Sequence, residues 1–222
     1  MISEFAELAR EKNLALIVDE TYRDFLTATP HYLFTSTSWR STFVHLFSFS
    51  KSYCLPGHRL GAIVASPLLL TTSLKSILDT VQICPPRLVQ LALAPLLPET
   101  RTFLRITAVN LKARHILFSE NLPKRWKVGA KVEGGYFAFV RHPFWDVESE
   151  TVCKRLAEDM GVLVPPGSFF RQEKGERTGT IINEGVDRWI RFSVANVDDD
   201  KVKKVCERLA ECEASFGWSL ED

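Results

Sequence analysis

The residues best suited to chemistry gather around Lys51. Ser48 and Ser50 precede it at the end of an apolar, β-branched segment, and Arg59 follows eight residues later. A lysine amine that is held in place can form an imine with an aldehyde. Hydroxyl groups and a planar guanidinium suit phosphate, and the glycines beside Arg59 let the backbone approach closely. The spacing therefore predicts a site for an aldehyde that carries a phosphate.

A second candidate, Asp19, ends a run of apolar residues at 14–18, and Tyr22 follows it. A carboxylate held so near a core is costly unless it is paired. A protonated pyridine nitrogen is a suitable partner, and pyridoxal phosphate (PLP) needs that protonation to accept electrons from a substrate. Ligands of open α/β sheets bind at the carboxyl ends of strands, where Asp19 and Lys51 both fall.

Each of these residues also has a simpler interpretation. Asp19 could cap a turn, Lys51 could be a solvated charge, and Arg59 could form a surface ion pair. The five cysteines are odd in number and widely spaced, which favours reduced thiols over disulfides or zinc. No metal site is predicted.

Taken together, the pattern resembles the class I/II aminotransferase family of fold-type I PLP enzymes. It consists of a strand that ends in Asp-x-x-Tyr, a strand that ends in Ser-x-Ser-Lys, and Arg-x-Gly eight residues after the lysine. The resemblance implies PLP as the cofactor, with Lys51 as the Schiff-base residue and Asp19 as the partner of the pyridine nitrogen. It further implies a ring-oxygen contact from Tyr22 and a phosphate site formed by Ser48, Arg59 and, as a weaker addition, Ser50.

The second half of the chain is similar to the small domain of that family. The motifs that carry this likeness are Val132–Phe137, Gly161–Phe170 and Trp189–Ser193. Arg191, in the last motif, would bind the α-carboxylate of the substrate through a bidentate pair. A surface ion pair is the alternative for this arginine.

The resemblance also implies that the family's N-terminal part is absent from this chain. That part supplies a phosphate-binding loop and an aromatic side chain that stacks on the cofactor ring. We therefore expect a truncated form, or a chain completed by another polypeptide. An uncovered sheet exposes backbone groups and apolar faces, so the chain alone is expected to be poorly soluble or oligomeric. Members of the family are usually homodimers, so the resemblance implies a homodimer.

The order of elements predicts an α/β fold: the C-terminal portion of a fold-type I large domain, with a mostly parallel sheet, plus a smaller α+β domain. Strands are predicted at 14–18, 42–48, 60–65, 162–164 and 189–194, with a hairpin at 127–132 and 136–141. Helices are predicted at 3–12, 67–83, 87–97, 99–122, 148–160 and 198–212. The predicted domains are a partial PLP-binding domain (1–100), a connecting helix (101–122) and a small domain (123–222).

Composition limits the choice of partners. The 222 residues carry 28 basic and 27 acidic side chains, a formal net charge of +1, and no basic run typical of nucleic-acid binding. No apolar stretch approaches the roughly 20 residues of a membrane span, and no secretory signal pattern is present. Neither a nucleic-acid nor a membrane partner is predicted, and the cytoplasm is the expected location.

The expected activity is amino-group transfer between an amino acid and a 2-oxo acid, with Lys51 moving the α-proton as base and acid. Two alternatives stay open. Another PLP reaction, such as that of a C–S lyase or of an enzyme like ACC synthase, would use the same lysine. The chain could instead be a catalytically inactive remnant that serves as a dimerising or regulatory partner.

Overall fold

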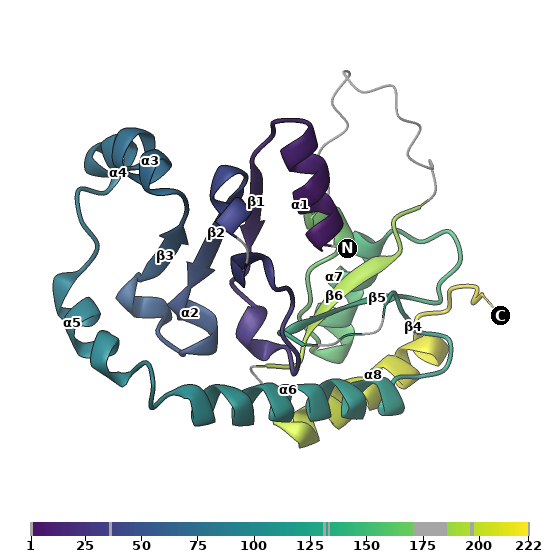
Figure 1. Ribbon diagram of the computed structural model, residues 1–222. Coiled ribbons are helices and arrows are strands. Elements are labelled where there is room, and N and C mark those ends of the chain that lie inside the picture. The colour runs from purple at the N-terminus through teal and green to yellow at the C-terminus, as the bar shows by residue number, and fades with distance from the viewer. Residues whose placement is uncertain are drawn as a thin grey trace. The chain divides into compact units, whose positions relative to one another are not determined.

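The computed structural model describes residues 2–35, 37–130, 132, 134–170, 186–195 and 198–221. The chain divides into two compact units, residues 1–109 and 110–222, and each contains a three-stranded sheet (Figure 1). The division falls inside helix α6 (Arg101–Asn121), which was predicted at 99–122. No helix of the described residues is both long and apolar enough to cross a bilayer.

The sheet of the first unit aligns three chain segments at one edge. Helix α1 (Ile2–Glu11) precedes β1 (Leu16–Asp19), and the sheet continues with β2 (Phe43–Ser48) and β3 (Gly61–Val64) in the order β1-β2-β3. Strands β1 and β2 are parallel, whereas β3 is antiparallel to β2. The carboxyl ends of β1 and β2 therefore meet the amino end of β3 at the same edge.

The remaining helices of this unit are short: α2 (Phe49–Ser52), α3 (Pro67–Leu69), α4 (Lys75–Val81) and α5 (Arg87–Leu96). A π-helical turn at Leu70–Leu74 interrupts the helix predicted at 67–83 and separates α3 from α4. Large apolar side chains in this unit are exposed, among them Ile17 on β1, Val81 on α4 and Leu88 on α5. This surface agrees with the expected uncovered apolar faces.

The second unit packs an antiparallel sheet against α7 (Ser149–Met160), α8 (Asp199–Ser215) and the end of α6, whose Phe118 lies in the core. Its strands are β4 (Lys127–Val128), β5 (Phe137–Arg141) and β6 (Trp189–Ser193), in that order. Alternate strand residues enter the core, where Val140 and Ile190 are fully buried with Leu156 of α7 and Leu209 of α8. The intervening residues of β6, including Arg191, face away from this core.

Two predictions for this unit are wrong in extent. Residues 162–164 form no strand. Directly after them, the Arg191 N–H donates to the Pro165 carbonyl (3.1 Å), and Pro166 forms an isolated bridge to Ile190. Two consecutive prolines lack the N–H groups that would extend a ladder. The first hairpin strand is only β4, and Lys131 and Glu133 of the predicted hairpin lie outside the described residues.

Candidate active site

Asp19 ends β1 with one carboxylate oxygen engaged in a turn. Its Oδ1 accepts hydrogen bonds from the Thr21 N–H (3.0 Å) and the Thr21 hydroxyl (2.6 Å). The turn cap considered as the simpler interpretation is thus present, but it uses only Oδ1. Among the described residues no hydrogen bond reaches Oδ2, so this oxygen is available to a ligand. Tyr22 follows, and its ring lies 5.9 Å from that of Phe25.

Lys51 lies on α2, directly after β2. Ser48 caps this helix by accepting a hydrogen bond from the Ser50 N–H (3.2 Å). The Lys51 side chain is half-buried, unlike a freely solvated surface lysine. Ser52, which is fully buried, donates to the Asp24 carboxylate (2.8 Å). That bond links the helix of Lys51 to the turn that follows Asp19. The sequence alone did not predict this bond.

Arg59 lies in the loop between α2 and β3. Its backbone is left-handed (φ 50°), and its Nη1 donates to the Pro56 carbonyl (2.9 Å). No ion pair to Arg59 exists among the described residues, so the surface pair considered above is not observed. Gly61 must be a glycine because an added Cβ would lie 2.9 Å from the Phe47 carbonyl oxygen. Gly57 has open space around it, so close backbone approach is not required there.

The predicted phosphate donors share one hollow. Ser48, Ser50 and Arg59 line a space of about 510 Å³, which Gly61 also lines. Two hydroxyls and one guanidinium are the donor types that bind phosphate, and the hollow is large enough for a small cofactor. The residues present therefore fit the phosphate end of PLP.

The predicted residues fall at one edge of the sheet. Asp19 pairs with Leu46, two residues before Ser48, and Ser48 pairs with Gly61. Side chains two apart on a strand share a face, so Asp19 and Ser48 point to the same side of the sheet. The structure thus places the ends of β1 and β2 and the start of β3 at one edge, where ligand sites form in α/β sheets. Asp19, Tyr22 and Lys51 are not among the residues that line the hollow of Ser48, Ser50 and Arg59.

Behind this edge lies a buried polar cluster that the sequence reasoning missed. Glu20 is adjacent to Asp19, and its Oε2 lies within 3.1 Å of nitrogens of Arg23, His31 and His45. Glu20 and both histidines are buried. The sequence signal was a second carboxylate directly after an apolar run, with two histidines downstream.

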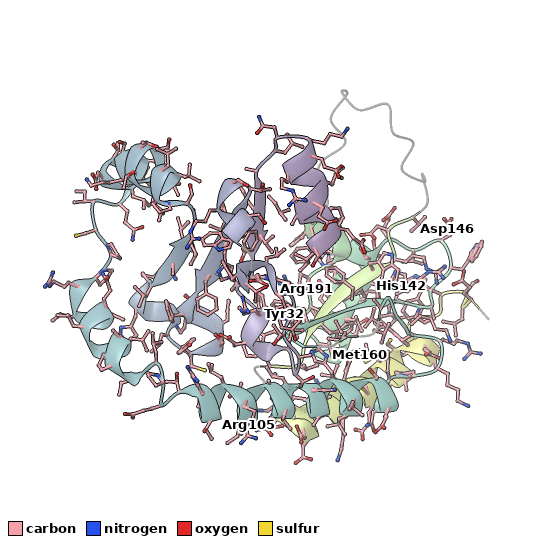
Figure 2. All side chains as sticks on the ribbon, in the orientation of Figure 1. Tyr32, Arg105, His142, Asp146, Met160 and Arg191 are labelled. Carbon is pink, nitrogen blue, oxygen red and sulfur yellow. The ribbon has the colours of Figure 1, made fainter. Side chains whose placement is uncertain are left out.

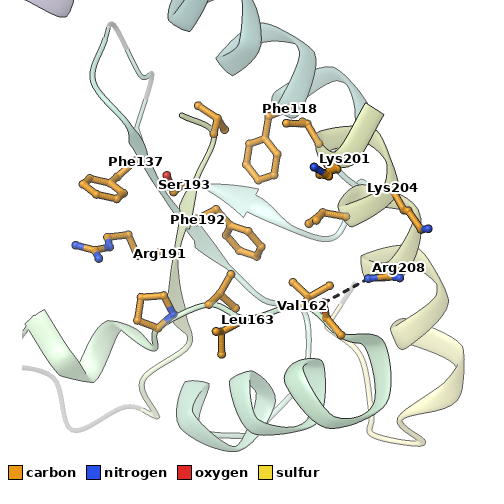
Figure 3. A pocket seen from close by; sticks show the side chains of 16 residues that line it. Phe118, Phe137, Val162, Leu163, Arg191, Phe192, Ser193, Lys201, Lys204 and Arg208 are labelled. Atoms are coloured by element: carbon orange, nitrogen blue, oxygen red, sulfur yellow. Dashed lines mark hydrogen bonds between the residues drawn. The ribbon is translucent and has the colours of Figure 1, made fainter. Parts of the chain in front are cut away.

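Arg191 projects from β6 in the second unit (Figure 2). Its guanidinium carbon lies 4.1 Å from the ring centroids of both Phe137 and Phe170, and such cation–π contacts fix its orientation. It borders a groove of about 340 Å³ that Lys204 and Arg208 also line (Figure 3). No described residue forms an ion pair with Arg191, so the surface pair considered as its alternative is not observed.

A protein-family model matches most of the chain. The model for "Aminotransferase class I and II" matches residues 1–209. The chain belongs to the class I and II aminotransferase family. Members of this family use pyridoxal phosphate.

Curated aminotransferases resemble the chain at low identity. An aspartate aminotransferase of Sulfolobus acidocaldarius is 24% identical over 218 residues, which cover 95% of this chain and 50% of that protein. A valine–pyruvate aminotransferase of Mycobacterium tuberculosis is 25% identical over 182 residues, which cover 78% of this chain and 45% of that protein. The chain thus spans about half the length of the curated relatives it matches.

Solved structures confirm the fold. A probable N-succinyldiaminopimelate aminotransferase from Thermus thermophilus superposes with a TM-score of 0.79 at 24% identity, covering 94% of this chain and 52% of that one. A kynurenine aminotransferase from Pyrococcus horikoshii gives 0.78 at 23% identity, covering 98% and 52%. The predicted α/β architecture, part of a fold-type I aminotransferase, is therefore confirmed.

Proposed function

We propose that the chain carries the lysine half of a PLP-dependent aminotransferase that moves an amino group between an amino acid and a 2-oxo acid. The single observation that carries the proposal is the shared hollow of Ser48, Ser50 and Arg59, next to the helix of Lys51. A phosphate-binding set beside a half-buried lysine is what attachment of a phosphorylated aldehyde needs.

The residues of the first unit take distinct roles in this proposal. Ser48, Ser50 and Arg59 hold the phosphate through hydroxyl and guanidinium donors. The Asp19 carboxylate would keep the ring nitrogen protonated, and Tyr22 would contact the ring oxygen. The cofactor, when bound, supplies the electron sink for bond cleavage at the substrate α-carbon.

Lys51 and Arg191 act on the substrate. With the cofactor bound, the Lys51 amine would hold it covalently until an amino substrate takes its place. The freed amine would then serve as the base that takes the proton from the substrate α-carbon and as the acid that returns it. The Arg191 guanidinium binds the substrate α-carboxylate with two parallel hydrogen bonds.

The proposal extends to organisation and location. It assigns residues 1–100 to a partial cofactor-binding domain, 101–122 to a connecting helix and 123–222 to a small domain. A homodimer is included, supported by exposed apolar side chains such as Leu88 and Val81, which a partner would cover. A cytoplasmic location is supported by the five cysteines, all of which are free thiols.

Amino-group transfer is tested with the purified chain and added PLP. The relatives' names include aspartate, valine–pyruvate and aromatic aminotransferases, so the assay presents these amino acids with 2-oxoglutarate or pyruvate as acceptor. We expect a 2-oxo acid and a new amino acid in equal amounts. Lys51→Ala should abolish both products, whereas Lys12→Ala, a change at an exposed residue of the N-terminal segment, should leave them unchanged.

The products separate the alternatives. Release of ammonia or a thiol in place of a new amino acid would point to another PLP reaction on the same scaffold. Uptake of PLP without any product would point to an inactive remnant. Turnover that survives Lys51→Ala would contradict the assigned role of this lysine.

A further inference from the structure

The carboxylate of Glu20 is the most heavily engaged side chain near the proposed cofactor site. Its Oε2 lies 2.8 Å from Nη1 of Arg23, 3.1 Å from Nε2 of His31 and 3.0 Å from Nε2 of His45. Only 7% of Glu20 is exposed. A buried carboxylate is tolerated because it is paired in this way, and a role confined to surface charge is excluded.

The hydrogen bonds around Glu20 define which ring nitrogen of His31 carries the proton. The Leu33 N–H donates to Nδ1 of His31 (3.2 Å), so that nitrogen carries no proton and Nε2 is the donor to Glu20. His45 is near enough for an ion pair, but the direction of its Nε2 does not satisfy a hydrogen bond among the described residues. Burial lowers the pKa of His45, which favours its neutral form. Arg23 therefore balances the carboxylate charge.

Glu20 and Asp19 send neighbouring carboxylates to opposite faces of the sheet. Asp19 pairs with Leu46, whereas His45, which contacts Glu20, pairs with Val18. The Glu20 N–H continues the ladder by donating to the Leu46 carbonyl (2.9 Å). This ladder bond fixes the backbone directly after Asp19, so the two carboxylates keep opposite faces.

Glu20 also contacts the turn that carries Tyr22, once through its backbone carbonyl and once through its carboxylate. The Arg23 N–H donates to the Glu20 carbonyl (3.0 Å), and the Phe25 N–H donates to the Tyr22 carbonyl (3.2 Å). The Arg23 side chain returns to the Glu20 carboxylate. Glu20 therefore contacts Arg23 of this turn through both its carbonyl and its carboxylate. Within the described part of the chain, the Glu20 side chain contacts no residue of the hollow lined by Ser48 and Arg59, and only its backbone N–H reaches a lining residue, Leu46.

We propose that Glu20 is a positioning residue that orients Asp19 and Tyr22 toward the ring of the cofactor. This inference rests on the proposed function. Different residues then position the two ends of the site. The ring end depends on the Glu20 cluster, and the phosphate end depends on α2 and the Arg59 loop. A change at Glu20 should thus weaken ring recognition and spare phosphate recognition.

The test compares the wild-type chain with Glu20→Gln, which keeps the shape and removes the charge, and with Glu11→Gln, a matched change at an exposed position of α1. Hydrogen exchange is measured at the Arg23 and Phe25 amides, with the Phe49 amide, which donates to Leu60, as the internal reference. Affinities for PLP and for inorganic phosphate are measured on the same samples. Loss of one charge-assisted bond should speed exchange in the turn about tenfold and weaken PLP binding about tenfold. The Phe49 amide and phosphate affinity should not change.

The results that would overturn the Glu20 inference differ from the result that would overturn the proposed function. Unchanged exchange in the turn of Glu20→Gln would overturn the inference, as would equal losses of PLP and phosphate affinity, which indicate a general structural role. Faster exchange with unaltered PLP affinity would also overturn it. If the wild-type chain takes up no PLP, the proposed function itself fails, and that result is recognisable because it does not involve the Glu20 variant.

Discussion

The hydrogen bond from Ser52 to Asp24 should be a measurable link between the helix of Lys51 and the turn that follows Asp19. The bond is 2.8 Å long, and Ser52 is fully buried. Hydrogen bonds to charged groups contribute about 1.5–3 kcal/mol. Because Asp24 is only half-buried and can regain some water, we expect Ser52→Ala to cost about 1.5–2 kcal/mol of unfolding free energy.

Urea denaturation measures this cost, and a double-mutant cycle isolates the bond. Trp39 is the only tryptophan before residue 110, so fluorine-labelled tryptophan reports the first unit separately. Ser52→Ala and Asp24→Ala together should show a coupling of about 1 kcal/mol or more. Ser73→Ala, at an exposed position of the π-helical turn, should change stability by less than about 0.5 kcal/mol. A coupling near zero would refute the claim that this bond joins the two segments.

Three further perturbations test other parts of the structure. Gly61→Ala should destabilise the first unit by about 1–3 kcal/mol because its Cβ meets a carbonyl oxygen at 2.9 Å, and in the same urea assay Gly57→Ala should be neutral. Burial lowers the pKa of His142 from 6.5 to about 3, so the unfolded chain binds a proton more readily and stability falls as the pH drops below about 6.5. By pH 5 this loss is about 2 kcal/mol, and His142→Asn should lose less over the same range of pH-dependent melts. Burial raises the pKa of three core thiols, to about 12 for Cys153 and Cys212 and about 11 for Cys206. A thiol reagent at pH 7.5 should therefore react quickly only with the exposed cysteines, Cys54 and Cys84, and fast reaction of a core thiol in the folded chain would contradict this.

The sequence was most informative where a strand runs directly into a polar residue. The apolar run at 14–18 predicted a buried strand that ends before Asp19. The structure places β1 at Leu16–Asp19, but the strand is not buried, and Ile17 is exposed. The segment ending at Ser48 was equally clear because its β-branched and aromatic residues favour a strand. The two strands, and the position of Lys51 directly after the second, could therefore be predicted from local pattern alone.

The sequence did not reveal contacts that depend on strand register. Glu20 meets His45 only because β1 and β2 pair in one particular alignment, and it meets His31 through the conformation of the segment between these strands. Ser52 and Asp24 are 28 residues apart and meet through the same packing. Residues 162–164 looked like a strand by composition, but ladder formation depends on the neighbouring prolines and on β6, which local propensity does not capture.

The central claim is that Lys51 holds pyridoxal phosphate in a site formed by its neighbours on the sheet edge. The most direct measurement adds PLP to the purified chain, reduces with borohydride and locates the adduct by peptide mass spectrometry. We predict a single major adduct on Lys51, lost in Lys51→Ala and weakened in Arg59→Ala, which removes a phosphate donor. No adduct, or the same labelling in Lys51→Ala, would contradict the account.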